Sequence, residues 1–200
     1  MTHKFAELAF TPAVRALRES MGSRKAYEKA EGAPLHHDRL GDAERDFIAE
    51  RDSFYLATVS ETGLPYIQHR GGLPGFVRVL DEKTLGFADF RGNRQYITLG
   101  NLAGNDRVAL FFMDYPRQAR LKLLGRARSI VIEDDLGLAA KLAMPGYSAK
   151  IERGFLISVE AFDWNCSQHI TPRFTAVEVA AIVTPLQQRI RELESLNTRD

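Results

Sequence analysis

The sequence predicts a mainly β fold: a six-stranded antiparallel barrel with flanking helices and a C-terminal helix. Between residues 54 and 128, short runs rich in β-branched and aromatic residues alternate with turn residues. These runs follow one another without the long helical crossovers that parallel strands need. The segments on either side have helical or loop-like patterns. We therefore expect one domain in three parts: an N-terminal extension (1–41), the barrel (42–170) and a C-terminal helical extension (171–200).

Composition narrows the function classes. The 200 residues are 44% hydrophobic and 26% charged, as in ordinary globular proteins. The net charge of +1 gives no field that would steer the chain to nucleic acid or to an anionic membrane, so we expect neither partner. One cysteine, Cys166, excludes an internal disulfide. The N-terminus lacks the apolar stretch of a secretory signal, and we expect a cytoplasmic protein.

Two helices are expected before the barrel. Thr11 and Pro12 mark a helix start, and Gly22 can end that helix. Residues 23–39 are polar and indicate a loop; its adjacent histidines lack the spacing of metal ligands, so we expect no metal. Asp42 is expected to cap a second helix that reaches about residue 51.

The expected barrel strands cover 54–59, 66–70, 76–80, 85–90, 107–114 and 119–132, and a last strand covers 154–162. The strand at 107–114 is so apolar that burial on both faces is expected. Gly125 would permit a bend or bulge. A short helix is expected over 94–102, opened by a turn at Gly92 and Asn93, and another over 134–144.

The C-terminal segment has two capping-box patterns, one starting at Thr175 and one at Thr184. Either one helix begins near Ala176 and kinks at Pro185, or a second helix starts there. The apolar residues form one stripe, which we expect to pack on the barrel or on a sister subunit rather than on a membrane: Ile182, Leu186, Ile190, Leu193 and Leu196.

Two polar, glycine-bearing interruptions of the β region are the candidate site. In the first, alternation places Gln68 and Arg70 on one face of a strand and His69 on the other. An edge strand that faces water would explain this pattern, but the following Gly71-Gly72 favours a ligand. In the second, free backbone N–H groups at Gly92-Asn93-Arg94 would attract an anion. Taken alone, that segment is better explained as a helix cap with surface arginines.

Together these segments resemble the pyridoxamine 5′-phosphate oxidase-related, FMN-binding split-barrel family. The resemblance covers roughly residues 44–170. It rests on the first interruption, on a second that runs from Asp89-Phe90-Arg91 through Gly92-Asn93-Arg94-Gln95, and on the order of the strands around them. It implies a split barrel and a homodimer with FMN at the subunit interface.

The resemblance also implies roles for individual residues. Asn93-Arg94-Gln95 matches the phosphate-binding turn, with Gln95 where the family usually has lysine. Ala88 and Asp89 match positions beside the ribityl chain, and Arg70 matches a position near the isoalloxazine edge, with Gln68 and His69 as its neighbours. Gln118 or Arg120 would reach the cofactor from the turn before the sixth strand, and Gln168 would cover it from the partner subunit.

The implied activity is that of an FMN-dependent oxidoreductase that acts on a small molecule or accepts electrons from a reduced nicotinamide. The true oxidase ends in a strand with an Arg-x-His element, whereas this chain ends in a helical pattern, so oxidation of pyridoxamine phosphate does not follow. No catalytic residue can be named. The alternatives are a flavin-binding or redox-sensing protein without turnover, the same barrel with haem or a deazaflavin, and a structural protein that dimerises through its C-terminal helix.

Overall fold

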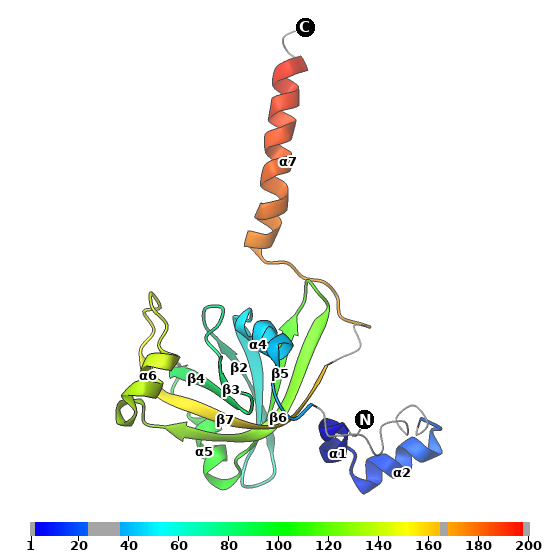
Figure 1. The fold of residues 1–200 in the computed structure, drawn as a ribbon, viewed down its shortest axis with the longest axis vertical. Coiled ribbons are helices and arrows are strands. Elements are labelled where there is room, and N and C mark those ends of the chain that lie inside the picture. Colours follow the sequence, from blue (N-terminus) through cyan, green and yellow to red (C-terminus); the bar gives the residue numbers. More distant parts are fainter. Residues whose placement is uncertain (1–2, 24–36, 165–167, 198–200) are drawn as a thin grey trace. The chain divides into compact units, whose positions relative to one another are not determined.

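The computed structural model describes residues 3–23, 37–164 and 168–197. The chain forms two compact units. The first contains Met1–Met113 and Arg120–Cys166, and the second contains Asp114–Ala119 and Ser167–Asp200. Each unit is described by itself below (Figure 1).

Within residues 3–23 and 37–52, three helices precede the sheet: α1 (Lys4–Ala9), α2 (Pro12–Ser20) and α4 (Asp42–Ala49). The start of α2 is as predicted, because the Thr11 side chain accepts a hydrogen bond from the backbone N–H of Val14. In α4 the cap is Gly41 rather than the predicted Asp42. The Glu44 carboxylate accepts the Gly41 N–H (2.9 Å) and the indole N–H of Trp164 (2.7 Å), which ties α4 to the last strand.

The sequence did not predict α1, which contacts the last strand of the sheet. His3 precedes this helix, and its ring stacks on that of His37 with 4.0 Å between centroids. Its Nε2 lies 3.4 Å from a carboxylate oxygen of Asp163. Burial lowers the pKa of His3, and the neighbouring His37 lowers it further.

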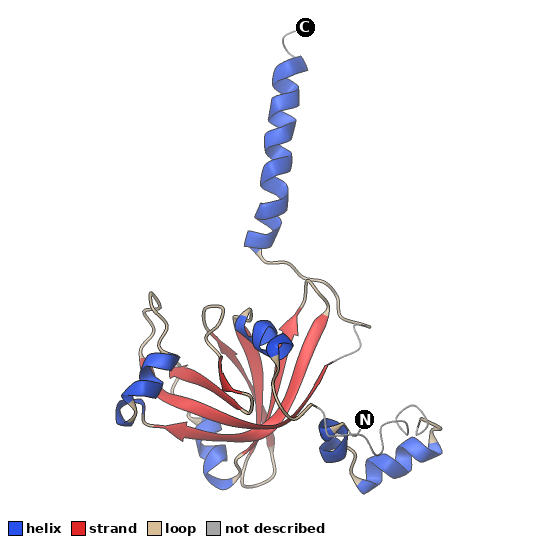
Figure 2. Ribbon diagram, in the orientation of Figure 1, coloured by secondary structure: helices blue, strands red, loops and turns tan. Residues whose placement is uncertain are grey.

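The first unit is built on one curved antiparallel sheet (Figure 2). Its strand order is β2-β1-β5-β6-β7-β4-β3. The predicted mainly β class is confirmed, with seven strands in the sheet instead of six. The strands are β1 (Ser53–Val59), β2 (Pro65–Gly71), β3 (Arg78–Asp81), β4 (Thr84–Phe90), β5 (Arg107–Asp114), β6 (Ala119–Ile130) and β7 (Ile151–Trp164).

Aromatic rings fill the inside of the curved sheet. Phe54 of β1 contacts Phe112 of β5 (5.0 Å between centroids) and Phe87 of β4 (5.2 Å). Phe87 also stacks on Phe155 of β7 (5.3 Å). Because β1 and β4 lie near opposite ends of the strand order, these contacts hold the two halves of the sheet against each other.

A bulge interrupts the pairing of β6 with β7 between Leu124 and Gly125, which confirms the predicted irregularity at Gly125. A Cβ atom at this position would lie 2.4 Å from the carbonyl oxygen of Ser158, so only glycine fits. The expectation that the strand at 107–114 is buried on both faces is wrong. In β5 burial alternates, because its other face is only partly covered.

Three further helical segments of the first unit are described by the structure. They are α5 (Ile97–Gly104), the short 3₁₀ helix η1 (Ile132–Asp134) and α6 (Leu136–Leu142). The Asp135 side chain caps α6 by accepting the N–H of Leu138 at 2.9 Å. The helix predicted over 134–144 is therefore present in a shorter form.

The second unit contains α7 (Ala176–Asn197), one helix that continues through Pro185. Thr175 and Glu178 form the predicted capping box, whereas the second one at Thr184 does not start a new helix. In the same unit the Gln118 side chain donates a hydrogen bond to the carbonyl of Ile170. Among the helices that the structure describes, none has the length and apolar character needed to cross a membrane.

Candidate functional site

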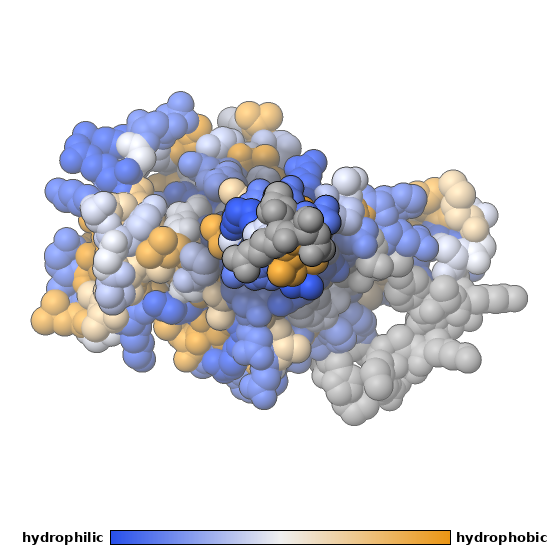
Figure 3. All heavy atoms as spheres, turned by 90° about the horizontal axis from the view of Figure 1, so that it is seen from above, coloured by the Kyte–Doolittle hydropathy of each residue, from blue (hydrophilic) through white to orange (hydrophobic). Residues whose placement is uncertain are grey.

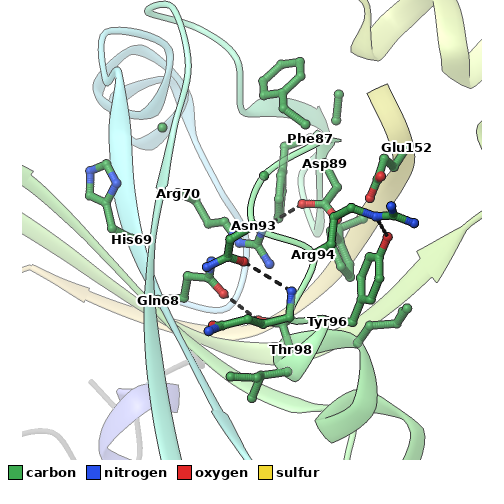
Figure 4. A pocket seen from close by; sticks show the side chains of 18 of the residues that line it. Gln68, His69, Arg70, Phe87, Asp89, Asn93, Arg94, Tyr96, Thr98 and Glu152 are labelled. Carbon is green, nitrogen blue, oxygen red and sulfur yellow. Dashed lines mark hydrogen bonds and ion pairs between the residues drawn. The ribbon is translucent and has the colours of Figure 1, made fainter. Parts of the chain in front are cut away.

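A pocket of about 290 Å³ lies between β2, β4, the loop at residues 91–96 and the start of α5 (Figure 4). It brings together the two polar interruptions of the β region, which β3 separates in the chain. Eight of the eleven predicted site residues line it: Gln68, His69, Arg70, Ala88, Asp89, Asn93, Arg94 and Gln95.

The strand β2 presents its side chains as the alternation predicts. Gln68 and Arg70 lie on the half-buried face, and His69 lies on the exposed face. The His69 ring contacts Tyr55 of β1 at 5.7 Å and points away from the other labelled side chains in Figure 4. His69 therefore borders the pocket from the strand, while the polar atoms of its neighbours face inward.

Hydrogen bonds fix the orientation of the Gln68 amide. Its oxygen accepts from the hydroxyl of Tyr66 (3.1 Å) and from the hydroxyl of Thr98 (3.4 Å). Since the oxygen is engaged on both sides, the NH₂ group of Gln68 is available as a donor at the pocket wall. Thr98 is buried in the first turn of α5, so this arrangement joins β2 to that helix.

A buried hydrogen bond also holds α5 to β1. The Asn101 amide donates to the Thr58 hydroxyl at 2.8 Å, and both side chains are buried. Because α5 follows the 91–96 loop directly, this bond positions one wall of the pocket.

An ionic bridge spans the pocket floor. Arg70 of β2 lies 2.6 Å from one carboxylate oxygen of Asp89 in β4, and Arg153 of β7 lies 3.3 Å from the other. The side chains of Arg70 and Asp89 are only 16% and 13% exposed. Burial raises the pKa of Asp89 above its ordinary value, although the two guanidinium groups act in the opposite direction. The bridge links strands from the two ends of the curved sheet.

Arg70 has a donor that this bridge does not use. Its Nε is buried, and no acceptor within the described residues lies in hydrogen-bonding range. Buried guanidinium N–H groups are normally satisfied, so an orphaned one on a pocket wall indicates a place for a polar ligand atom.

The loop at 91–96 has a strained backbone. Arg94 and Tyr96 adopt left-handed conformations with φ of 60° and 54°, which are uncommon for residues other than glycine. The Asn93 side chain accepts the backbone N–H of Gln95 at 3.2 Å, and the Arg94 Nε donates to the Tyr96 hydroxyl at 2.9 Å. These bonds hold Arg94 at the pocket rim.

The prediction that a helix opens at Gly92 and Asn93 is wrong. α5 begins at Ile97, because the left-handed Tyr96 ends the loop as the helix N-cap. The free N–H groups of the first helical turn therefore belong to Ile97, Thr98 and Leu99, and these three residues line the pocket. The expected anion-attracting helix end exists, three residues later than predicted.

Cations outnumber carboxylates around this rim. Glu152 lies 3.7 Å from Arg91 and 3.3 Å from Arg153, so its charge is matched. Within the part of the chain that the structure describes, Arg94 has no carboxylate at ion-pair distance. Arg91 and Arg153 do not line the pocket themselves, but both pair with carboxylates that do. The ionic cluster around the pocket therefore has four guanidinium groups and two carboxylates, an excess of two positive charges: Arg70, Arg91, Arg94 and Arg153 against Asp89 and Glu152.

Three predicted site residues do not line this pocket. Gln118 and Gln168 belong to the second unit, and Arg120 places its guanidinium 5.7 Å from the ring of Phe111. Their roles stay predictions. Sequence reasoning missed several lining residues: Phe87, Phe90, Tyr96, Thr98, Glu152 and Phe155. Those of β7 reach the pocket only because β7 pairs with β4, a long-range pairing that no local pattern indicates.

A family model described as pyridoxamine 5′-phosphate oxidase matches residues 40–161, more than half of the chain. The chain belongs to the pyridoxamine 5′-phosphate oxidase family. The matched segment contains every residue that lines the pocket. No curated protein matches the chain.

Several solved structures are similar to the chain at low identity. HupZ from Group A Streptococcus is 19% identical and covers 68% of this chain and 99% of its own, with a TM-score of 0.48. A Clostridium acetobutylicum protein of the pyridoxinephosphate oxidase family is 16% identical, with coverages of 68% and 94% and a TM-score of 0.45. An FMN-binding protein from Syntrophomonas wolfei is 14% identical, with coverages of 77% and 95% and a TM-score of 0.44.

Proposed function

We propose that this chain is an FMN-binding flavoprotein and an FMN-dependent oxidoreductase that acts on a small molecule. The observation that carries the proposal is the pocket itself. It combines an excess of positive charge, a free helix N-terminus and an orphaned buried donor with apolar walls. An anionic tail and a polar-edged planar ring are the two parts of FMN that such a pocket suits.

The residues present fit the cofactor part by part. Arg94 and the first-turn N–H groups of α5 supply the donors that a phosphate needs. Gln95 contributes no charge, so in our proposal Arg94 takes the larger share of phosphate binding. The NH₂ group of Gln68 and the Nε of Arg70 offer donors to the oxygen and nitrogen atoms of an isoalloxazine edge.

When bound, the flavin supplies the electron chemistry, and the protein binds and orients it. Asp89 holds Arg70 and Arg153 in place, so that the donors on the pocket wall are set before a ligand arrives. The rings of Phe87 and Phe155 exclude water from the inner wall. No side chain of the pocket is assigned as a proton donor or acceptor.

The proposal includes a homodimer with the cofactor at its interface. The pocket volume of about 290 Å³ lies just below the roughly 300–1,000 Å³ of ligand pockets, which supports a site that a second chain completes. The strands β1 and β2 and the turn between them expose apolar side chains that a second copy would cover: Tyr55 (37%), Leu64 (67%) and Ile67 (63%). In this arrangement Gln118, Arg120 and Gln168 would contact the cofactor bound by the partner.

The first experiment is the visible spectrum of the purified protein. We expect absorption near about 450 nm from bound oxidised flavin, or its appearance with a defined stoichiometry after addition of FMN. A colourless protein that takes up no FMN would refute the proposal.

A second experiment separates an oxidoreductase from a binding protein without turnover. NADH or NADPH is added to the flavin-loaded protein under anaerobic conditions, and the flavin absorption is followed. Bleaching faster than that of free FMN under the same conditions supports a reductase. A flavin that stays oxidised with both donors removes the nicotinamide-dependent activity from the proposal and leaves flavin binding.

A further inference from the structure

The helix α7 carries an apolar stripe whose spacing is that of a coiled coil. All 22 of its residues are described by the structure, and none of them is buried. Five of its large apolar residues recur at alternating intervals of four and three positions, which places them at the d and a positions of successive heptads: Val179, Val183, Leu186, Ile190 and Leu193. Ile182 and Leu196, the other members of the apolar stripe predicted from the sequence, fall at g positions beside this seam, and Val177 falls at a b position outside it.

The residue types at these positions favour two parallel strands. β-branched Val183 and Ile190 occupy a positions, and Leu186 and Leu193 occupy d positions, which is the combination that favours parallel dimers. The next a position is Asn197, a residue that can pair with its own counterpart only when the two helices are parallel and in register.

Charges beside the stripe point to a second copy of the same helix. Arg189 lies at a g position and Glu194 at the following e position, five residues later. In a parallel dimer a g side chain faces the e side chain five residues on in the partner, so both pairs would be oppositely charged. In the single chain Arg189 bonds to Glu192 at an exposed site, a contact that costs little to exchange.

The side of α7 opposite the stripe is mainly polar. Hydrophobic and hydrophilic side chains both appear where Figure 3 looks along the helix.

Pro185 falls at a c position, away from the stripe, so its ring would not obstruct a partner. A register shifted by three residues would place Arg189 in the seam instead. Because Pro185 removes a backbone hydrogen bond and no side chain of α7 is buried, the helix needs a packing partner to be stable.

We propose that α7 pairs with α7 of a second copy as a parallel, in-register, two-stranded coiled coil. The seam consists of the a and d residues from Val179 to Asn197, and the Arg189–Glu194 pairs flank it. The proposal does not depend on flavin binding. It assigns a role in assembly to a C-terminal helix that lies outside the segment matched by the family model.

Disulfide trapping in the full-length protein tests the proposal. In a Cys166→Ser background, single cysteines are introduced by Val179→Cys and by Leu193→Cys, both at d positions about 21 Å apart along the helix. The matched control is Gln188→Cys at an outward f position. After mild oxidation, covalent dimers are measured by gel electrophoresis without reductant.

We expect Val179→Cys and Leu193→Cys to give dimers at least about tenfold faster than Gln188→Cys, because a disulfide requires Cα atoms within about 7 Å. Equal rates at all three positions, or no dimers, would overturn the proposal, and the stripe would then cover the chain's own barrel or another surface. Trapping at only one of the two d positions would also overturn it, because an antiparallel or shifted pair brings only one position near its own copy.

A charge exchange provides a second readout that leaves the seam intact. Arg189→Glu and Glu194→Arg should each slow trapping at position 193, and the double variant should restore the rate. Single variants without effect, or a double variant slower than both, would refute the assigned pairing.

Discussion

Replacing Arg70 by methionine tests whether the ionic bridge closes the two ends of the sheet. The change removes a charged hydrogen bond of 2.6 Å and leaves the Asp89 carboxylate with Arg153 alone at 3.3 Å. Charged hydrogen bonds contribute about 1.5–3 kcal/mol, and breaking a fully buried ion pair costs about 3–5 kcal/mol. Since both side chains keep some exposure, we expect the free energy of unfolding to fall by about 2–3 kcal/mol at pH 7.

The stability lost in the Arg70→Met variant should depend on pH, and the raised pKa of Asp89 sets the direction of that dependence. Burial holds the pKa of Asp89 above its ordinary value of 3.8, so the folded protein binds this proton more tightly than the unfolded chain does. Ionisation of Asp89 therefore lowers stability as the pH rises through that pKa. Without Arg70 the pKa rises further. A protonated Asp89 needs no counter-ion, so the difference between variant and wild type should shrink as the pH falls toward 4.

The assay is urea unfolding of flavin-free protein at pH 7 and pH 4, followed by the fluorescence of the single tryptophan, Trp164. Arg126→Met is the matched control, because Arg126 forms ion pairs with Asp106 and Glu160 on the exposed surface and should change stability little. A loss below about 0.5 kcal/mol at pH 7, or the same loss at both pH values, would refute the role given to Arg70.

Three further predictions concern parts of the fold that support the site. Gly125→Ala should lower the free energy of unfolding by about 1–3 kcal/mol or more in urea, because its Cβ would lie 2.4 Å from the Ser158 carbonyl; an unchanged midpoint would contradict the bulge geometry. Thr58→Val should cost about 1–3 kcal/mol by leaving the buried Asn101 amide unpaired, and a smaller loss would mean that α5 is held otherwise. Burial lowers the pKa of His3 below its ordinary value of 6.5, so the attachment of α1 should weaken as the pH falls below 6.5. Limited proteolysis at pH 7.5 and 5.5 should show faster cleavage near α1 at the lower pH. Equal cleavage rates at the two pH values would exclude the effect.

The sequence predicted the fold well where a single local pattern, such as alternation or an isolated glycine, determines one secondary-structure element. The alternation in β2 correctly separates His69 from Gln68 and Arg70, and the glycine at position 125 correctly marks the bulge. The helix α5 was placed too early, because Arg94 and Tyr96 adopt left-handed conformations that their residue types disfavour. The surrounding structure imposes that backbone, and no local propensity indicates it.

The part of the candidate site that comes from the two polar interruptions could be predicted from the sequence. Its two polar interruptions are unusual for a β region, and the pocket gathers residues from both. The other half comes from tertiary structure: Glu152 and Phe155 reach the pocket through the pairing of β7 with β4, and Asp89 meets Arg70 only because the sheet curves. Such pairings depend on the whole chain, and a single sequence does not encode them in a readable motif.

The most direct test of the proposed flavin site compares the affinities of FMN and riboflavin, which differ only in the phosphate. Fluorescence titration of flavin-free protein should give a dissociation constant for FMN at least about tenfold lower than for riboflavin, as charge-assisted hydrogen bonds to a phosphate would produce. Arg94→Ala should remove most of this preference. Equal affinities, or no binding of either flavin, would contradict the assignment of this pocket.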